Sequence, residues 1–141
     1  MRMLVRSVVP VLALAVGAAV VAVPGGCRRS EPPGAATATG SVVFQGRPVT
    51  GGLVIFSPDP DRGGSGKPVR GELGPDGRFR LAREGSDAIP PGWYRVAIVA
   101  LPSGAAGFPP RLARPDLSGI VREVRADREN VFDFAVEVSG P

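Results

Sequence analysis

The segment that decides the fold runs from residue 90 to residue 100 and reads Pro90-Pro91-Gly92-Trp93-Tyr94-Arg95-Val96-Ala97-Ile98-Val99-Ala100. Two prolines and a glycine precede a run of aromatic and β-branched residues, which is the composition of a β-strand. Side chains alternate between the two faces of a strand. We therefore expect residues 93–100 to form a central strand, with the Tyr94 face in the core and the Arg95 face the wetter one.

Six further segments have strand-like composition, and turn residues separate them. The 20 glycines and 16 prolines favour a fold with many turns over one built from long helices. In the last segment Phe132, Phe134, Val136 and Val138 are expected to point inward, opposite acidic residues that point outward. Seven short strands predict an all-β protein with a two-sheet sandwich. The expected strands are residues 39–45, 51–57, 69–73, 78–81, 93–100, 120–125 and 131–138.

The N-terminus has the three-part pattern of a secretory signal. Arg2 and Arg6 precede an apolar run over residues 7–23, which Pro24-Gly25-Gly26-Cys27 follows. A spanning helix would need about 20 uninterrupted apolar residues. The Gly-Gly-Cys sequence resembles the lipobox of bacterial lipoproteins, whose cysteine becomes the first residue and carries acyl chains. Ordinary signal cleavage near Ala22 is the alternative, with Cys27 left as a free thiol.

These features divide the chain into three parts: a lipoprotein signal peptide at 1–26, a disordered tether at 27–38 and a β-sandwich at 39–139. The tether composition, rich in Pro, Gly, Ala and Thr, is typical of a flexible linker. We expect an exported protein anchored in a membrane by lipid on Cys27, at the periplasmic face or the cell surface. A secreted soluble protein is the alternative location.

The composition argues against several function classes. The chain has no histidine and one cysteine, so it lacks the commonest general base and the commonest metal ligand. We expect no enzyme activity, no cofactor and no metal. Asp59 and Asp61 precede a glycine-rich stretch, but a calcium loop needs more oxygen ligands, and solvated carboxylates in a turn are expected instead. Basic residues form no long run, so nucleic-acid binding is not expected.

Five short motifs follow one another along the chain. They are Gly40-Ser41-Val42-Val43-Phe44-Gln45-Gly46-Arg47-Pro48-Val49, Gly74-Pro75-Asp76-Gly77-Arg78-Phe79, Pro91-Gly92-Trp93-Tyr94-Arg95-Val96, the loop ending Pro115-Asp116-Leu117-Ser118-Gly119-Ile120, and Asn130-Val131-Phe132-Asp133-Phe134. In this order they resemble the motifs of carboxypeptidase regulatory-like domains, in their lipoprotein branch. This resemblance implies a transthyretin-like (prealbumin-like), seven-stranded Greek-key sandwich without catalytic activity. It transfers no active site, because the shared residues are glycines, prolines and core residues.

Two functions follow from this reading. The first is a lipid-anchored interaction module of the cell envelope, whose partner is an envelope protein or a glycan. The second is a carbohydrate- or small-ligand-binding module. Trp93 is the candidate sugar platform, although packing against a neighbouring strand or the long loop is the expected role of its ring. Arg78, Arg80 and Arg95 are candidate partner contacts, because outward arginines could line up across a sheet as a basic docking face, although acids lie among them and an ordinary solvated face is the expected role.

Overall fold

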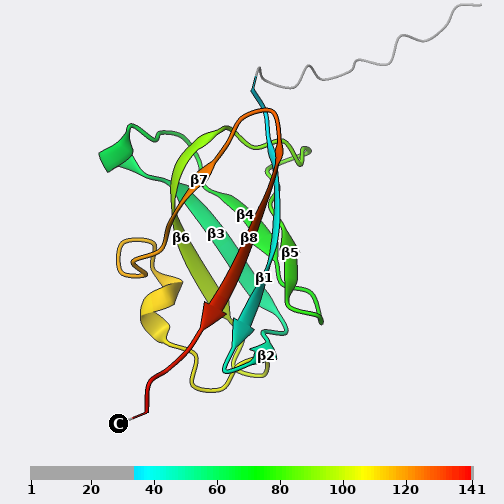
Figure 1. Cartoon of the computed structure of the whole chain (residues 1–141), viewed down its shortest axis with the longest axis vertical. Helices are drawn as coiled ribbons and strands as arrows, with labels where there is room; N and C mark the ends of the chain where they lie inside the picture. Colours follow the sequence, from blue (N-terminus) through cyan, green and yellow to red (C-terminus); the bar gives the residue numbers. More distant parts are fainter. Residues whose placement is uncertain (1–33, 141) are drawn as a thin grey trace, which may run out of the picture.

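The computed structural model describes residues 34–140, and over that range the chain is an all-β sandwich of two sheets (Figure 1). The signal segment, Cys27 and most of the expected tether lie outside the described residues. All seven expected strands are confirmed to within two residues at each end. The strands are β1 (Thr37–Phe44), β2 (Arg47–Pro48), β3 (Gly52–Pro58), β4 (Val69–Glu72), β5 (Arg78–Arg80), β6 (Gly92–Ala100), β7 (Val121–Val124) and β8 (Glu129–Val136).

The additional strand, β2, follows directly from a two-residue turn. Gln45 and Gly46 both have positive φ angles, 51° and 76°, so the chain reverses tightly and β2 pairs with the end of β1. The sequence predicted a turn at this point but not the return pairing. The chain then passes to the other sheet, where β3 begins.

One sheet has the order β4-β3-β6-β7, with all neighbours antiparallel. In the other sheet β1 pairs on one side with β5 and β2, and on the other side with β8. The β1–β8 pair is parallel and runs in register from Thr37↔Glu129 to Phe44↔Val136. The expectation that residues 93–100 form a central strand is confirmed, because β6 has a hydrogen-bonded neighbour on each side.

The core lies between the sheets and follows the predicted alternation. Tyr94, Val96 and Ile98 are buried on the inner face of β6, and Phe79 and Leu81 are buried at β5. In β8, Phe134 is buried and Phe132 packs against the core. Val138, expected inside, is 45% exposed because β8 ends at Val136 and the chain leaves the sheet. Full burial of one such side chain contributes about 1.5–3 kcal/mol.

Both ends of the sandwich are closed by segments that the sequence assigned to linkers. At one end Ala36 exchanges two backbone hydrogen bonds with Ile89, and Ala36 and Ala38 are buried. The domain therefore begins before residue 39, within the expected tether. From the opposite end of β6, residues 102–119 run to the core, where the Phe108 ring packs edge-on against Phe44 at 5.3 Å.

The same long segment also covers the outer face of the sheet. Its short helical turn η2 (Pro110–Ala113) lies against β6 and has a buried leucine, Leu112. Ala97, on the outer face of β6, is fully buried. A second turn of this type, η1 (Pro60–Arg62), follows β3. Within residues 34–140, no helix has the length and apolar composition needed to cross a bilayer.

Candidate functional site

Asp59 is a buried carboxylate at the end of β3, and it organises the neighbouring surface. Its side chain is fully buried and begins η1, where its Oδ1 accepts the Asp61 N–H at 3.2 Å. The same oxygen lies 3.0 Å from Arg95 Nε, and Oδ2 accepts Arg62 Nη1 at 2.8 Å. Arg95 also pairs with Asp61. One buried charge therefore fixes two arginines, as buried carboxylates require to offset their desolvation.

The sequence reading of this carboxylate was wrong in one respect. Asp59 and Asp61 were both expected to be solvated, but only Asp61 is exposed. A local signal for burial was present in Asp59-Pro60, since an acidic residue before a proline is the pattern that begins a helical turn. The second signal, Arg95, lies 36 positions later in the sequence, and only the pairing of β3 with β6 brings the two together.

The pKa of Asp59 is held below its ordinary value of 3.8, chiefly by the hydrogen bond from Arg62 and against the opposing effect of burial. The Asp61 N–H and Arg95 act in the same direction. A carboxylate whose folded pKa is depressed stabilises the fold fully above its unfolded pKa, and this contribution is lost as the pH falls through the folded value.

We therefore expect Asp59→Asn to lower the melting temperature at neutral pH and to have a smaller effect as the pH falls below about 4. The measurement is thermal unfolding of both proteins from neutral pH to about pH 2. If the two melting temperatures fell in parallel over the whole range, the buried ion pairs would not contribute as described.

Trp93 lies beside this network on the outer face of β6. It is 39% exposed, and the Arg62 guanidinium lies over its ring at 5.1 Å from the centroid. Its carbonyl accepts the Asp59 N–H at 2.9 Å. A cation from the η1 turn is therefore one partner of the ring, and its packing against a neighbouring strand or the long loop stays a prediction. We call Trp93, Arg62, Asp59 and Arg95 the Trp93 surface.

The three arginines of the expected docking face do not share a sheet. Arg78 and Arg80 are on β5, which pairs with β1, whereas Arg95 is on β6 in the opposite sheet. Arg95 is held by Asp59, and Arg80 lies 3.6 Å from Asp87. The three arginines therefore do not form the candidate basic face as a single surface, because alternation along each strand does not predict which sheet the strand joins.

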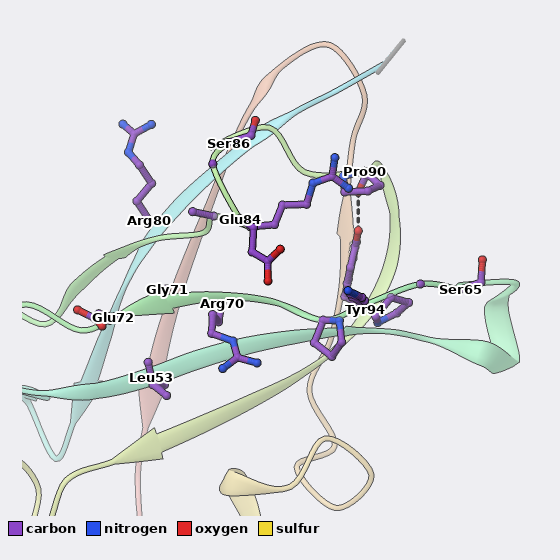
Figure 2. Close-up of a pocket in the computed structure, with 17 residues that line it drawn as sticks. Leu53, Ser65, Arg70, Gly71, Glu72, Arg80, Glu84, Ser86, Pro90 and Tyr94 are labelled. Carbon is purple, nitrogen blue, oxygen red and sulfur yellow. Dashed lines mark hydrogen bonds between the residues drawn. The ribbon is translucent and has the colours of Figure 1, made fainter. Parts of the chain in front are cut away.

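A groove runs beside β4, between that strand and the residue 82–90 loop (Figure 2). Its basic side chains include Lys67, Arg70 and Arg83, and among the described residues none of these makes an ion pair. Figure 2 shows Glu84 pointing from the loop toward β4. We call this feature the β4 groove.

Tyr94 forms part of the groove wall. Its hydroxyl donates a hydrogen bond to the Pro90 carbonyl at 2.6 Å, the dashed line in Figure 2. Burial raises the pKa of this phenol, while the nearby charge of Arg83 opposes the shift. The phenol is therefore a fixed hydrogen-bonding group in a groove whose lining has more basic side chains than carboxylates, the latter being Glu72 and Glu84.

Among residues 34–140, no group of three or more histidine, cysteine, aspartate or glutamate side chains is placed to hold a metal ion. The paired carboxylates Asp59 and Asp61 face guanidinium groups. The described groups at the two surfaces are charged side chains, hydrogen-bonding groups and an aromatic ring.

A bacterial enzyme domain is among the solved structures to which this chain is similar. No family model matches the chain, and no curated protein matches it. The dioxygenase domain of a dioxygenase–carbohydrate-binding protein fusion from the cellulolytic bacterium Streptomyces sp. SirexAA-E is 25% identical, covers 79% of this chain and 84% of that chain, and superposes with a TM-score of 0.46.

Proposed function

We propose that the protein is a non-catalytic binding module of the bacterial cell envelope, held at a membrane by lipid on Cys27. The observation that carries this proposal is the position of the domain relative to that cysteine. The sandwich begins at Ala36, nine residues after Cys27. Backbone hydrogen bonds join Ala36 to Ile89 at one end of the molecule. Nine residues span at most about 30 Å, so the anchor would hold this end close to the bilayer.

We infer that the sandwich is the Greek key of transthyretin-like, carboxypeptidase regulatory-like domains. The support comes from strand pairing: the first strand is antiparallel to β5 and parallel to the last strand, and the second sheet has the order β4-β3-β6-β7. The motifs that suggested the family also lie at points where the backbone is constrained. An added Cβ on Gly77, whose φ is 73°, would lie 2.8 Å from the Val42 carbonyl oxygen.

Lipidation of Cys27 predicts a specific N-terminal mass. We expect the mature protein from its own cell to begin at Cys27 and to carry a diacylglyceryl group, with a further acyl chain on the amine. Mass spectrometry of the N-terminal peptide is the measurement, together with partition of the protein into a detergent phase. Two or more chains anchor stably, at about 0.8 kcal/mol per buried methylene.

The matched control is Cys27→Ala, which should move the protein to the aqueous phase and leave its melting temperature unchanged, because the position lies outside the sandwich. A free Cys27 thiol, or a mature chain that begins near residue 23, would contradict the anchor and favour the secreted alternative.

A ligand-binding module is the second candidate function, and the β4 groove favours it. Lys67, Arg70 and Arg83 lie around one concave surface without carboxylate partners in the described part of the chain. Binding of an acidic oligosaccharide should weaken by about two- to fivefold for each arginine replaced by glutamine. Arg78→Gln is the matched control, since Arg78 is on β5 outside this groove, and an equal loss there would show non-specific attraction.

A further inference from the structure

We propose that the Trp93 surface is the face by which the domain rests on the bilayer that holds its anchor. The inference depends on the proposed lipidation of Cys27 and adds an orientation to it. The partner is therefore the lipid–water interface of that same membrane.

The first argument is the place where the chain enters the domain. Gly34 lies beside Pro91 and Ala126, since a Cβ added there would be 3.7 Å from Pro91 Cγ and 3.6 Å from Ala126 Cβ. Trp93 follows Pro91 by two residues, a distance of about 7 Å along a strand. The tether therefore meets the domain next to the start of β6, and Trp93 is the first exposed large apolar side chain on that strand.

The second argument is the reach of the tether. Only residues 28–35 separate Cys27 from Ala36. The nine Cα–Cα steps from Cys27 to Ala36 extend at most about 30 Å. A weak surface contact becomes populated at so short a reach, because a short link gives an effective concentration of about 1 mM or more.

The third argument is chemical. Tryptophan is enriched at the bilayer interface, because its ring is apolar and its N–H needs a polar partner. Arg62 stands over that ring with a 48% exposed side chain, and only its Nη1 is used by Asp59. Its remaining donors suit lipid phosphate. Figure 1 shows η1, which carries Arg62, projecting from the sandwich near the end where β1 begins.

The fourth argument is that the pair is held in place before any contact. Arg62 is fixed by the buried Asp59 carboxylate, and Arg95 braces the same carboxylate from β6. An ordered side-chain pair loses less conformational entropy on docking than two free side chains. The buried Asp59 carboxylate therefore orders the exposed side chain that would contact the membrane.

Trp93 is the only tryptophan of the chain, so its intrinsic fluorescence tests the proposal without a label. The full mature protein is reconstituted into vesicles of phosphatidylcholine and phosphatidylglycerol, with and without bromine on the acyl chains. The reference sample is the protein in detergent-free buffer after enzymatic removal of the tether. Relative to it, we expect the Trp93 emission maximum to shift to the blue by about 10 nm on vesicles. With brominated lipid we expect the emission to lose about half its intensity. Unshifted and unquenched emission from protein bound to the vesicles would overturn the proposal.

Three variants make the test specific to this face. Arg62→Gln should reduce bromolipid quenching by about half, since it removes the phosphate donor beside the ring, whereas Arg78→Gln on the opposite sheet should leave quenching unchanged. In the double variant Trp93→Phe with Leu101→Trp, the reporter lies just past the other end of β6, where we expect no quenching. Equal quenching at positions 93 and 101 would overturn a defined orientation.

The N-terminal mass of the same sample separates this proposal from the anchor itself. An acylated Cys27 with unquenched Trp93 would overturn the docking face and leave the anchor standing. An unmodified Cys27 in protein that does not stay with vesicles would overturn both. A fluorescence change on addition of a neutral oligosaccharide, with no effect of brominated lipid, would assign the surface to a sugar and also overturn the membrane contact.

Discussion

Replacing Gly40 by alanine is expected to destabilise the domain by about 3 kcal/mol or more, because β1 has no room for a side chain at this position. A Cβ added to Gly40 would lie 1.8 Å from the Phe132 carbonyl oxygen and 2.8 Å from Phe79 Cζ. The first contact is with backbone, so relief requires β1 and β8 to separate. The second is with a buried ring of β5, which has little freedom to move.

For a domain of this size the loss corresponds to a fall in melting temperature of about 12–20 °C. Thermal or urea unfolding is the measurement. Gly46→Ala is the control: its Cβ would meet nothing within 4 Å, and its φ of 76° is the source of strain. We expect about 1 kcal/mol there. If Gly40→Ala cost no more than Gly46→Ala, the parallel β1–β8 pair would not be as close as described.

Asn130→Asp is expected to cost about 2–4 kcal/mol at neutral pH, since the side-chain amide closes the β7–β8 turn from within. Asn130 is 7% exposed, and its Oδ1 accepts the Arg125 N–H at 2.9 Å. Its Nδ2 donates toward three carbonyl oxygens, those of Thr37, Arg125 and Arg128, at 3.1–3.2 Å. A carboxylate oxygen in place of Nδ2 would face these carbonyls with no proton to share.

The destabilisation caused by Asn130→Asp is expected to depend on pH. A carboxyl among acceptors has its folded pKa raised, so the destabilisation should shrink as the pH falls and the group takes up a proton. The control is Asp133→Asn on the same strand, whose exposed carboxylate accepts the Ser41 hydroxyl at 2.8 Å and no other side-chain donor within residues 34–140. We expect a change within about 0.5 kcal/mol there. A pH-independent loss in Asn130→Asp would show that packing, not hydrogen bonding, governs the site.

Strand positions could be predicted from the sequence because each strand carries its own signal. Alternation placed Tyr94 and Phe134 inside, and the glycines and prolines between the strands placed the turns. The predictions that failed were those that depend on which distant segments of the chain pair with one another. Asp59 is buried against Arg95, which lies on another strand. Arg80 and Arg95 lie in different sheets because the chain crosses from one sheet to the other between them.

The candidate site was predictable only in part for the same reason. Trp93 was singled out as a residue of interest, and its outer-face position was predicted correctly. Its partner Arg62 carried no sequence signal, because it lies in a polar loop where a solvated arginine is the ordinary expectation. The β4 groove was also missed, since its basic residues come from separate segments that meet only in the folded chain.

The pairing of the first strand with the last has a consequence for how the protein is made. Phe44 lies opposite Val136, so about 90 residues must be synthesised after β1 before its partner exists. At about 5–20 residues per second, a nascent β1 waits roughly 5–20 s with that edge open. Any truncation that removes β8 should therefore abolish folding of the sandwich, because β1 would lack its parallel partner along its whole length.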